Sequence, residues 1–378
     1  MPCTGAASES LDLSIPPLRR PVTAAVPRLK MLMRFRVSLR TLLALTTLLC
    51  VVGGVAFLRF KAERNAEEQL VADGLAISFD PWGNRGSYWY NDPEIEQENA
   101  SETLLGRLNW ELLRHVRCVD GQRSATEADT ASTVDDNSLR SLESLRHVEI
   151  LYLGFQPITD LGLESLRHLH SLKHLNLCGT KISDDGLANI TNLDALEYLA
   201  LEFTIITDSG LKHLVGFEDL EELALMGTKI KGPGLSHLVR LASLRRLGLS
   251  GTAVRSDDLL HLSSLASLEN LSLSNTKIDD SASIHLSKLS TLKKLNVAEN
   301  RLSDEFLVEL SALSSIESLN ISGTGVTDRS ESVILGLPNL LNFCASDTSM
   351  SAECRARIGD FVRRNRYKGY SAIGRDGG

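Results

Sequence analysis

A 24-residue repeat decides what this chain can fold into. Nine units follow one another in a single register over residues 145–360, without one insertion. Each unit approximates the pattern L-x-x-L-x-x-L-x-L-x-x-T-x-I-x-D-x-G-L-x-x-L-x-x, which weakens towards the last unit. A fixed period of this length predicts a solenoid. The units begin at Leu145, Leu169, Leu193, Phe217, Leu241, Leu265, Leu289, Leu313 and Leu337.

Two periods inside the unit predict its local structure. The Leu-x-Leu segment at positions seven to nine has strand spacing, so both leucines point to one face. The later Gly-Leu-x-x-Leu segment has helical spacing. A unit of strand, turn and short helix buries its apolar face only by stacking on its neighbours. We expect an α/β solenoid that curves, with a parallel sheet on the concave face and short helices on the convex face.

Composition narrows the function. Hydrophobic residues make up 43% of the 378 residues but aromatic residues only 5%, which favours a repetitive leucine core. The six cysteines form no C-x-x-C pair, so we expect neither a disulfide framework nor a structural zinc site. A net charge of −8 argues against nucleic-acid binding through bulk charge. Motifs of serine hydrolases, nucleotide-binding loops and zinc proteases are missing from the sequence, so we expect no enzyme, no cofactor, no metal and no small-molecule substrate.

The N-terminal region predicts a membrane segment. Residues 1–40 carry seven Lys or Arg and two acidic residues, and residues 41–58 carry no charge. Those eighteen residues would form a helix of about 27 Å, close to the hydrocarbon thickness of a bilayer. We expect a retained transmembrane anchor, although Gly54 and Ala56 also suit a cleavage site. The basic excess places residues 1–40 in the cytoplasm and the repeats outside it, in the periplasm or at the cell surface.

The remaining segments flank the repeats. Residues 59–100 read as a charged stalk followed by an irregular linker, and residues 101–144 as an N-terminal cap. Within this cap we expect a helix over Glu102–His115 and a first strand over Val116–Val119. Residues 361–378 read as a C-terminal cap and tail. A helix longer than those of the repeats is expected over Ala352–Arg366, because a solenoid must cover its last open edge.

Three ladders of polar residues recur in the repeat. The aspartates at position sixteen are expected to accept hydrogen bonds at the start of each helix. The threonines at position twelve are expected to bond backbone after each strand, and the histidines at position twenty-one to lie on the outer helices without binding metal. These sets are Asp160, Asp184, Asp208, Asp280, Asp304 and Asp328; Thr180, Thr204, Thr228, Thr252, Thr276, Thr324 and Thr348; and His213, His237, His261 and His285.

The candidate binding residues lie at positions six, eight, ten and eleven, which face the concave surface and vary between units. Aromatic residues cluster in the first three units and mixed charges follow, as in a protein-binding patch. The alternative is that these aromatic residues pack under the N-terminal cap, and the sequence leaves both possibilities open. The candidates are Tyr152, Phe155, Tyr198, Glu202, Phe203, Glu222 and Arg246.

The unit pattern resembles the leucine-rich-repeat family over residues 145–360, and in part from Leu139. In repeat type it is close to F-box-type ubiquitin-ligase receptors, and it also looks like bacterial membrane-anchored leucine-rich-repeat proteins. The family has Asn or Cys at position twelve, whereas seven units here have Thr. The resemblance implies a protein-binding scaffold with a protein ligand on the concave face.

Three functions are compatible with these observations. The hydrophobic segment at 41–58 favours a membrane-anchored scaffold that binds a protein outside the cytoplasm. The repeat type alone permits an intracellular substrate-recognition adaptor of the F-box kind, although no F-box precedes the repeats. A passive structural protein of the cell envelope is the third possibility.

Overall fold

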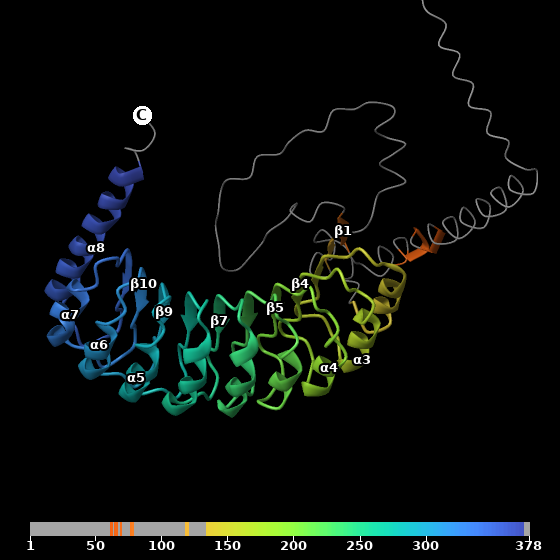
Figure 1. Cartoon of the computed structure of the whole chain (residues 1–378), viewed down its shortest axis with the longest axis horizontal. Helices are drawn as coiled ribbons and strands as arrows, with labels where there is room; N and C mark the ends of the chain where they lie inside the picture. The colour runs from red at the N-terminus through yellow and green to blue at the C-terminus, as the bar shows by residue number, and fades with distance from the viewer. Residues whose placement is uncertain are drawn as a thin grey trace, which may run out of the picture. The chain divides into compact units, whose positions relative to one another are not determined.

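The computed structural model describes residues 61–62, 64–66, 69, 76–78, 118–120 and 134–373. Eleven strands in this part of the chain form one sheet whose spatial order follows the sequence. Each repeat adds one three-residue strand at positions six to eight, paired in parallel with its neighbour and shifted by one unit. Figure 1 shows the strands on the inner side of the curve and the helices on the outer side. The parallel sheet and the curved solenoid are therefore confirmed.

The strands and helices alternate along the repeats. The strands are β3 (Ile150–Tyr152), β4 (His174–Asn176), β5 (Tyr198–Ala200), β6 (Glu222–Ala224), β7 (Arg246–Gly248), β8 (Asn270–Ser272), β9 (Lys294–Asn296), β10 (Ser318–Asn320) and β11 (Asn342–Cys344). The α-helices are α3 (Asp160–Leu163), α4 (Asp184–Ala188), α5 (Ser283–Leu286), α6 (Asp304–Leu310) and α7 (Glu331–Leu335). The 3₁₀ helices are η1 (Ser138–Ser144), η2 (Glu164–Leu166), η3 (Gly210–Leu214), η4 (Pro233–Arg240), η5 (Ser256–Ser264), η6 (Asp280–Ala282) and η7 (Asp328–Ser330).

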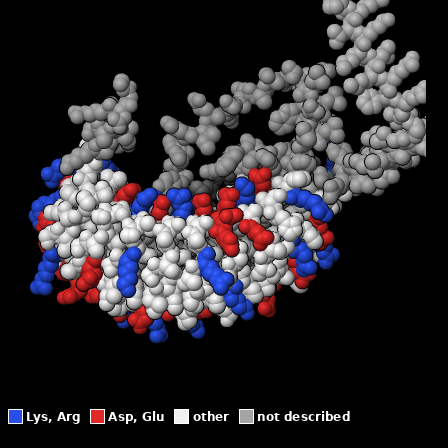
Figure 2. Space-filling view, in the orientation of Figure 1, with Lys and Arg blue, Asp and Glu red and all other residues white. Residues whose placement is uncertain are grey.

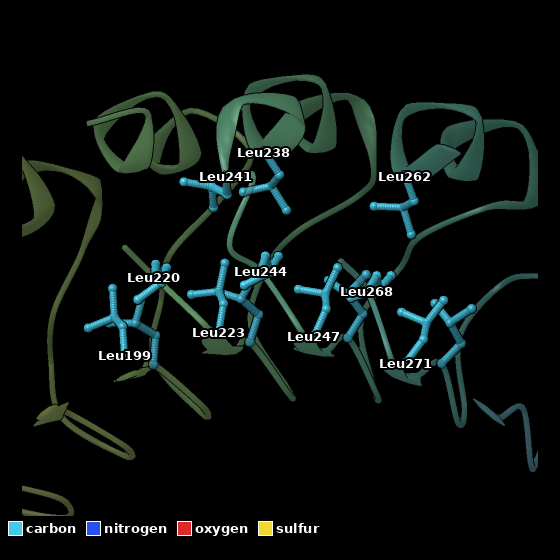
Figure 3. Close-up of a cluster of buried hydrophobic side chains, with 14 of the residues drawn as sticks. Leu199, Leu220, Leu223, Leu238, Leu241, Leu244, Leu247, Leu262, Leu268 and Leu271 are labelled. Carbon is cyan, nitrogen blue, oxygen red and sulfur yellow. The ribbon is translucent and has the colours of Figure 1, made fainter. Parts of the chain in front are cut away.

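The core is a set of leucine columns that run along the solenoid. Leu199, Leu223, Leu247 and Leu271 occupy position seven of consecutive units, and each is at most 2% exposed. Figure 3 shows them in line beneath leucines from the preceding turns and the helices. Because each leucine packs between its equivalents in the adjacent units, the buried side chains form one continuous cluster.

Both ends of the solenoid differ from the repeats. Strand β2 (Cys118–Asp120) extends the parallel sheet next to β3, two residues later than the strand predicted from the sequence. Strand β1 (Ala76–Ser78) pairs antiparallel with β2, so the predicted stalk and linker contribute a strand to the sheet. This strand could not be predicted from the sequence, because it has only three residues and lies outside the repeats. At the other end, α8 (Ala352–Ile373) begins inside the ninth unit and buries Cys354, Ile358 and Val362 as expected.

The N-terminal predictions fall largely outside the described residues. Residues 61, 62, 64–66 and 69 are helical, and Ala66 joins the core cluster. The predicted cytoplasmic segment 1–40, the membrane segment 41–58 and the helix over Glu102–His115 are not among the described residues. Within the part of the chain that is described, no helix has both the length and the apolar character needed to cross a membrane.

The threonine ladder is as predicted. Each Thr at position twelve is at least partly buried and donates its hydroxyl to the carbonyl three residues earlier, as Thr204 does to Leu201 at 2.6 Å. Asn300 takes this place in the seventh unit, where its amide group donates to three carbonyl groups. Its Oδ1 accepts from the backbone and hydroxyl of Thr276, which ties two units together.

The aspartate ladder acts between units, which corrects the expectation that each Asp caps its own helix. The N-cap of α4 is Ser183, whose hydroxyl accepts from the backbone of Asp185. Asp160 of the preceding unit accepts from the Ser183 backbone N–H at 2.8 Å and from its hydroxyl at 2.5 Å. Asp184 and Thr207 repeat this arrangement, as do Asp304 and Thr327. The aspartate therefore orients the capping residue of the next unit.

Candidate protein-binding site

The strands bring three of the candidate residues into one row on the concave face. Tyr198, Glu222 and Arg246 are directly opposite one another on β5, β6 and β7. Arg246 Nε donates to Glu222 Oε2 at 2.5 Å, so this pair is an ion pair across adjacent strands. The ring of His174 on β4 lies 5.9 Å from the ring of Tyr198, centroid to centroid. The row thus runs from aromatic to acidic to basic.

Glu202 is a buried carboxylate in the turn that follows β5. It follows β5 at position ten, is only 7% exposed, and its Oε2 has no hydrogen-bond partner among the described residues. Burial raises the pKa of Glu202, a hydrogen bond from its own backbone opposes this shift, and the nearby charge of Glu222 adds to it. An unpaired carboxyl group in such a place lowers stability, because the group loses hydration without gaining a partner.

Tyr198 and Cys178 share this environment. Both side chains are partly buried, and burial raises the pKa of the Tyr198 phenol as well as that of the Cys178 thiol, to about 11 for the thiol. The negative charge of Glu202 adds to each shift, and Tyr152 adds to that of Tyr198. Four groups from units one to three therefore lie close enough to interact electrostatically, namely Tyr152, Cys178, Tyr198 and Glu202. The sequence analysis did not identify Cys178 as a candidate.

Phe155 and Phe203 lie on a different line from the tyrosines. They occupy position eleven, in the turn after the strand, with side chains 65% and 54% exposed. Their φ values are 61° and 57°, in the left-handed region. Bulky side chains rarely adopt this conformation, which costs about 1–2 kcal/mol for residues other than glycine.

Each phenylalanine lies against a glycine at the same position of the next unit. A Cβ atom on Gly179 would lie 2.5 Å from Cδ1 of Phe155, and one on Gly227 would lie 2.6 Å from Cδ1 of Phe203. Both glycines also have left-handed backbones. Glycine after each phenylalanine in units one to four therefore leaves room for the ring, because a Cβ atom on either glycine would overlap it.

The structure thus divides the seven candidates into two groups. Tyr152, Tyr198, Glu222 and Arg246 lie on the sheet, where the two tyrosines are half-buried and Arg246 is exposed, and Glu202 is buried in the turn after β5. Phe155 and Phe203 lie on the turns after their strands. We call these two phenylalanines the aromatic edge. The alternative that the N-terminal cap covers the aromatic residues concerns residues 79–120, of which only 118–120 are described.

The metal-ligating residue types in the described part of the chain do not gather into a cluster. No group of three or more His, Cys, Asp or Glu side chains there is placed to hold a metal ion. The histidines at position twenty-one are half-buried on the outer helices, and burial lowers the pKa of His213. Figure 2 shows basic and acidic side chains interspersed over the face in view.

Comparisons with known proteins agree with this architecture. The family model described as "Leucine Rich repeat" matches residues 168–190 and 288–310, which correspond to the second and seventh units in one register. Among curated protein sequences, none matches this chain.

Three solved structures are among those to which this chain is similar. An internalin, InlF, from Listeria monocytogenes is 22% identical, covering 67% of this chain and 86% of that one, with a TM-score of 0.46. Internalin C2 from the same organism is 24% identical, covering 59% and 88%, with a TM-score of 0.44. The receptor kinase ectodomain GASSHO1/SCHENGEN3 from Arabidopsis thaliana, solved with CASPARIAN STRIP INTEGRITY FACTOR 2, is 18% identical, covering 56% and 31%, with a TM-score of 0.39.

The decisive observations are the repeat and the way it folds. Nine units in one register each contribute a strand to a parallel sheet and leucines to one continuous core. The family model matches residues 168–190 and 288–310, which cover most of two of those units. The chain is a leucine-rich-repeat protein.

Proposed function

We propose that this protein is a membrane-anchored scaffold whose concave face, in units one to five, binds a protein ligand outside the cytoplasm. The observation that carries the proposal is the aromatic edge. Phe155 and Phe203 keep a strained backbone conformation while more than half of each side chain stays exposed. Strain of this kind persists at functional sites, where it is offset by what the residue does there.

The neighbouring sheet residues support a protein ligand. Half-buried tyrosines beside the Glu222–Arg246 ion pair offer both apolar area and directional polar contacts. Residues on adjacent strands lie about 4.8 Å apart, so positions from three units form one continuous patch. Leucine-rich-repeat proteins use such surfaces as binding scaffolds, and no arrangement of the described side chains suggests a reaction.

The anchor and the location rest on the sequence. The uncharged segment 41–58 and the basic residues ahead of it support an anchor with the repeats on the far side of the membrane. A reporter inserted after residue 100 tests this. Activity confined to a reporter that functions outside the cytoplasm agrees with the proposal, whereas activity in the cytoplasm favours the adaptor function.

Site-specific crosslinking tests the binding face in the full chain. A photoreactive phenylalanine analogue at Phe203 should give a discrete protein adduct in the native host. The same analogue at Leu260, which is 47% exposed on the outer helix η5, serves as the control and should not. Adducts of equal yield at both positions, or none at either, would support a passive structural protein instead.

A further inference from the structure

We propose that Glu202 recognises a cationic side chain, Arg or Lys, of the protein ligand. This inference rests on the proposed function and specifies the chemistry at the centre of that surface. Glu202 is more than nine-tenths buried, and its Oε2 is without a hydrogen-bond partner in the described part of the chain. A buried charged group is stable only when paired, so the site lacks one cation.

Several other glutamates of the repeats form ion pairs, whereas Glu202 forms none with the described residues. Glu222 is paired with Arg246 at 2.5 Å, and Glu197 with Lys173 at 3.1 Å. Glu269 has two partners, Arg245 at 2.9 Å and Lys293 at 3.1 Å. Each of these acids has its cation on a neighbouring unit. No described basic residue forms such an ion pair with Glu202, which leaves this carboxylate open to a cation of the ligand.

Aromatic side chains complete the site. Tyr198 is on β5 and Glu202 is in the turn that follows this strand, and the two groups interact electrostatically. Phe203 follows it directly and exposes 54% of its side chain. A carboxylate with aromatic residues nearby suits a guanidinium or an ammonium group, through a charge-assisted hydrogen bond and contact with a ring face. Arg is favoured, because its planar group can also stack on the rings.

A ligand gains access to this carboxylate only if the protein rearranges locally. Oε2 of Glu202 is shielded from solvent, so the side chains that cover it must move when the cation binds. Gly227 lies beside the ring of Phe203 and presents no Cβ to obstruct it. Burial raises the pKa of Glu202 in the free protein, so the arriving cation also favours release of a proton from this carboxyl group.

Methionine methyl groups provide a local reporter. The chain has five methionines, and Met226 occupies the position equivalent to Glu202 in the next unit. The Phe203 backbone N–H donates to the Met226 carbonyl at 2.8 Å. Met350 is buried in the last unit and serves as an internal control for folding. The full chain, labelled with ¹³C at the methionine methyl groups, is titrated with N-acetyl-arginine amide and with its uncharged isostere, N-acetyl-citrulline amide.

The expected result is specific to one position, one charge and one residue. Arginine amide should shift the Met226 signal saturably and leave Met350 in place, whereas citrulline amide should shift neither. Glu202→Gln should weaken the arginine response at least about tenfold, as for a lost charge-assisted hydrogen bond. Glu269→Gln removes one charge elsewhere and should change it less than about twofold, because that acid is already paired.

Three results would overturn the inference: no response of Met226 to arginine, an equal response to citrulline, or an unchanged response in Glu202→Gln. If that variant loses the folded Met350 signal, Glu202→Asp replaces it with the same expected loss, since its carboxylate is one carbon shorter. A crosslinked ligand at Phe203 together with an arginine-insensitive Met226 would contradict this inference alone. An arginine response without any crosslinked ligand would contradict the proposed function alone.

Discussion

Asp258 places its carboxylate against Gly232, which reverses the arrangement found at the earlier junctions between units. A Cβ atom on Gly232 would lie 2.0 Å from Asp258 Oδ2. At the second junction the aspartate comes first, and a Cβ on Gly186 would lie 2.3 Å from Oδ1 of Asp160. In both cases one carboxylate fills the space beside the glycine and accepts a backbone N–H at the helix start of the later unit. Asp258 accepts from Arg255, and Asp160 accepts from Ser183. At these two junctions the carboxylate and the glycine therefore form a pair, in either order.

The first prediction is that these two positions are energetically coupled. Gly186→Ala should cost about 1–3 kcal/mol of unfolding free energy, because its methyl group overlaps the Asp160 carboxylate. The cost should fall in an Asp160→Ser background. Ser256 and Ala282 occupy the two equivalent positions later in the chain, where a small side chain therefore stands opposite an alanine. A double-mutant cycle by chemical denaturation measures the coupling, expected at about 1 kcal/mol or more. Additive effects would show that the contact is not what makes glycine necessary.

The second prediction concerns the leucine columns. Leu247 is 2% exposed between its equivalents on both sides, so Leu247→Ala should cost about 2–5 kcal/mol. Leu260 is 47% exposed on the outer face of η5, so Leu260→Ala should cost less than about 0.5 kcal/mol. Urea unfolding of both variants compares the two positions. Similar losses would mean that the inner and outer faces of the unit are misassigned.

The core could be predicted from the sequence because one local pattern, repeated nine times, specifies the same packing each time. Leu247 and Thr252 have the burial and the bonds expected from positions seven and twelve. The left-handed turn at position eleven also has a signal in the sequence. Gly occupies it in four units and Asn275 in a fifth, and these residues tolerate that backbone.

The contacts between units were harder to predict. The bond from Ser183 to Asp160 joins residues at different positions of adjacent units, and the pattern of a single unit does not show it. The exchange of Ser and Asp in the pair Ser256 and Asp279 carries the signal, because the two partners change places together. The unpaired state of Glu202 depends on which cations its neighbours already hold, so it needed the structure.

The third prediction is a pH dependence with opposite signs at two glutamates. The pKa of Glu202 is raised above its ordinary value of 4.5, so the folded state binds more protons and stability falls as pH rises through that window. The pKa of Glu269 is lowered by hydrogen bonds from Arg245 and Lys293, so its contribution is present above 4.5 and is lost as pH falls.

Glutamine variants test these signs by thermal unfolding at several pH values. Glu202→Gln should be more stable than the parent at pH 7, with the gain vanishing below the ordinary carboxyl pKa. Glu269→Gln should be less stable at pH 7, with the loss vanishing at low pH. A Glu202→Gln variant that is less stable at pH 7 would mean that the carboxylate has an internal partner.

The fourth prediction concerns the C-terminal cap. Ile358 is fully buried where α8 covers the last repeat, whereas Ala356 on the same helix is exposed. Ile358→Asp places an unpaired charge in the core and should cost about 3–5 kcal/mol. Ala356→Asp introduces the same charge and should be tolerated. Light scattering during thermal unfolding should show aggregation for Ile358→Asp alone, and a stable monomer would contradict the capping role of α8.

The central claim is that the aromatic edge serves ligand binding, although its left-handed backbone conformation lowers the stability of the fold. Phe203→Gly tests it most directly, because position eleven already holds glycine in four other units. Relief of about 1–2 kcal/mol of backbone strain exceeds the entropic cost of about 0.5–1 kcal/mol for glycine. Asn275→Gly, at the same turn position outside the patch, is the matched control.

The measurement combines unfolding free energy with the yield of a ligand adduct, formed through a photoreactive residue at position 155. The account predicts that Phe203→Gly is as stable as the parent or more stable, and that its adduct yield falls to the background level. Asn275→Gly should keep the full yield. A Phe203→Gly protein that loses stability while its adduct yield stays unchanged would contradict the claim and make Phe203 a structural residue.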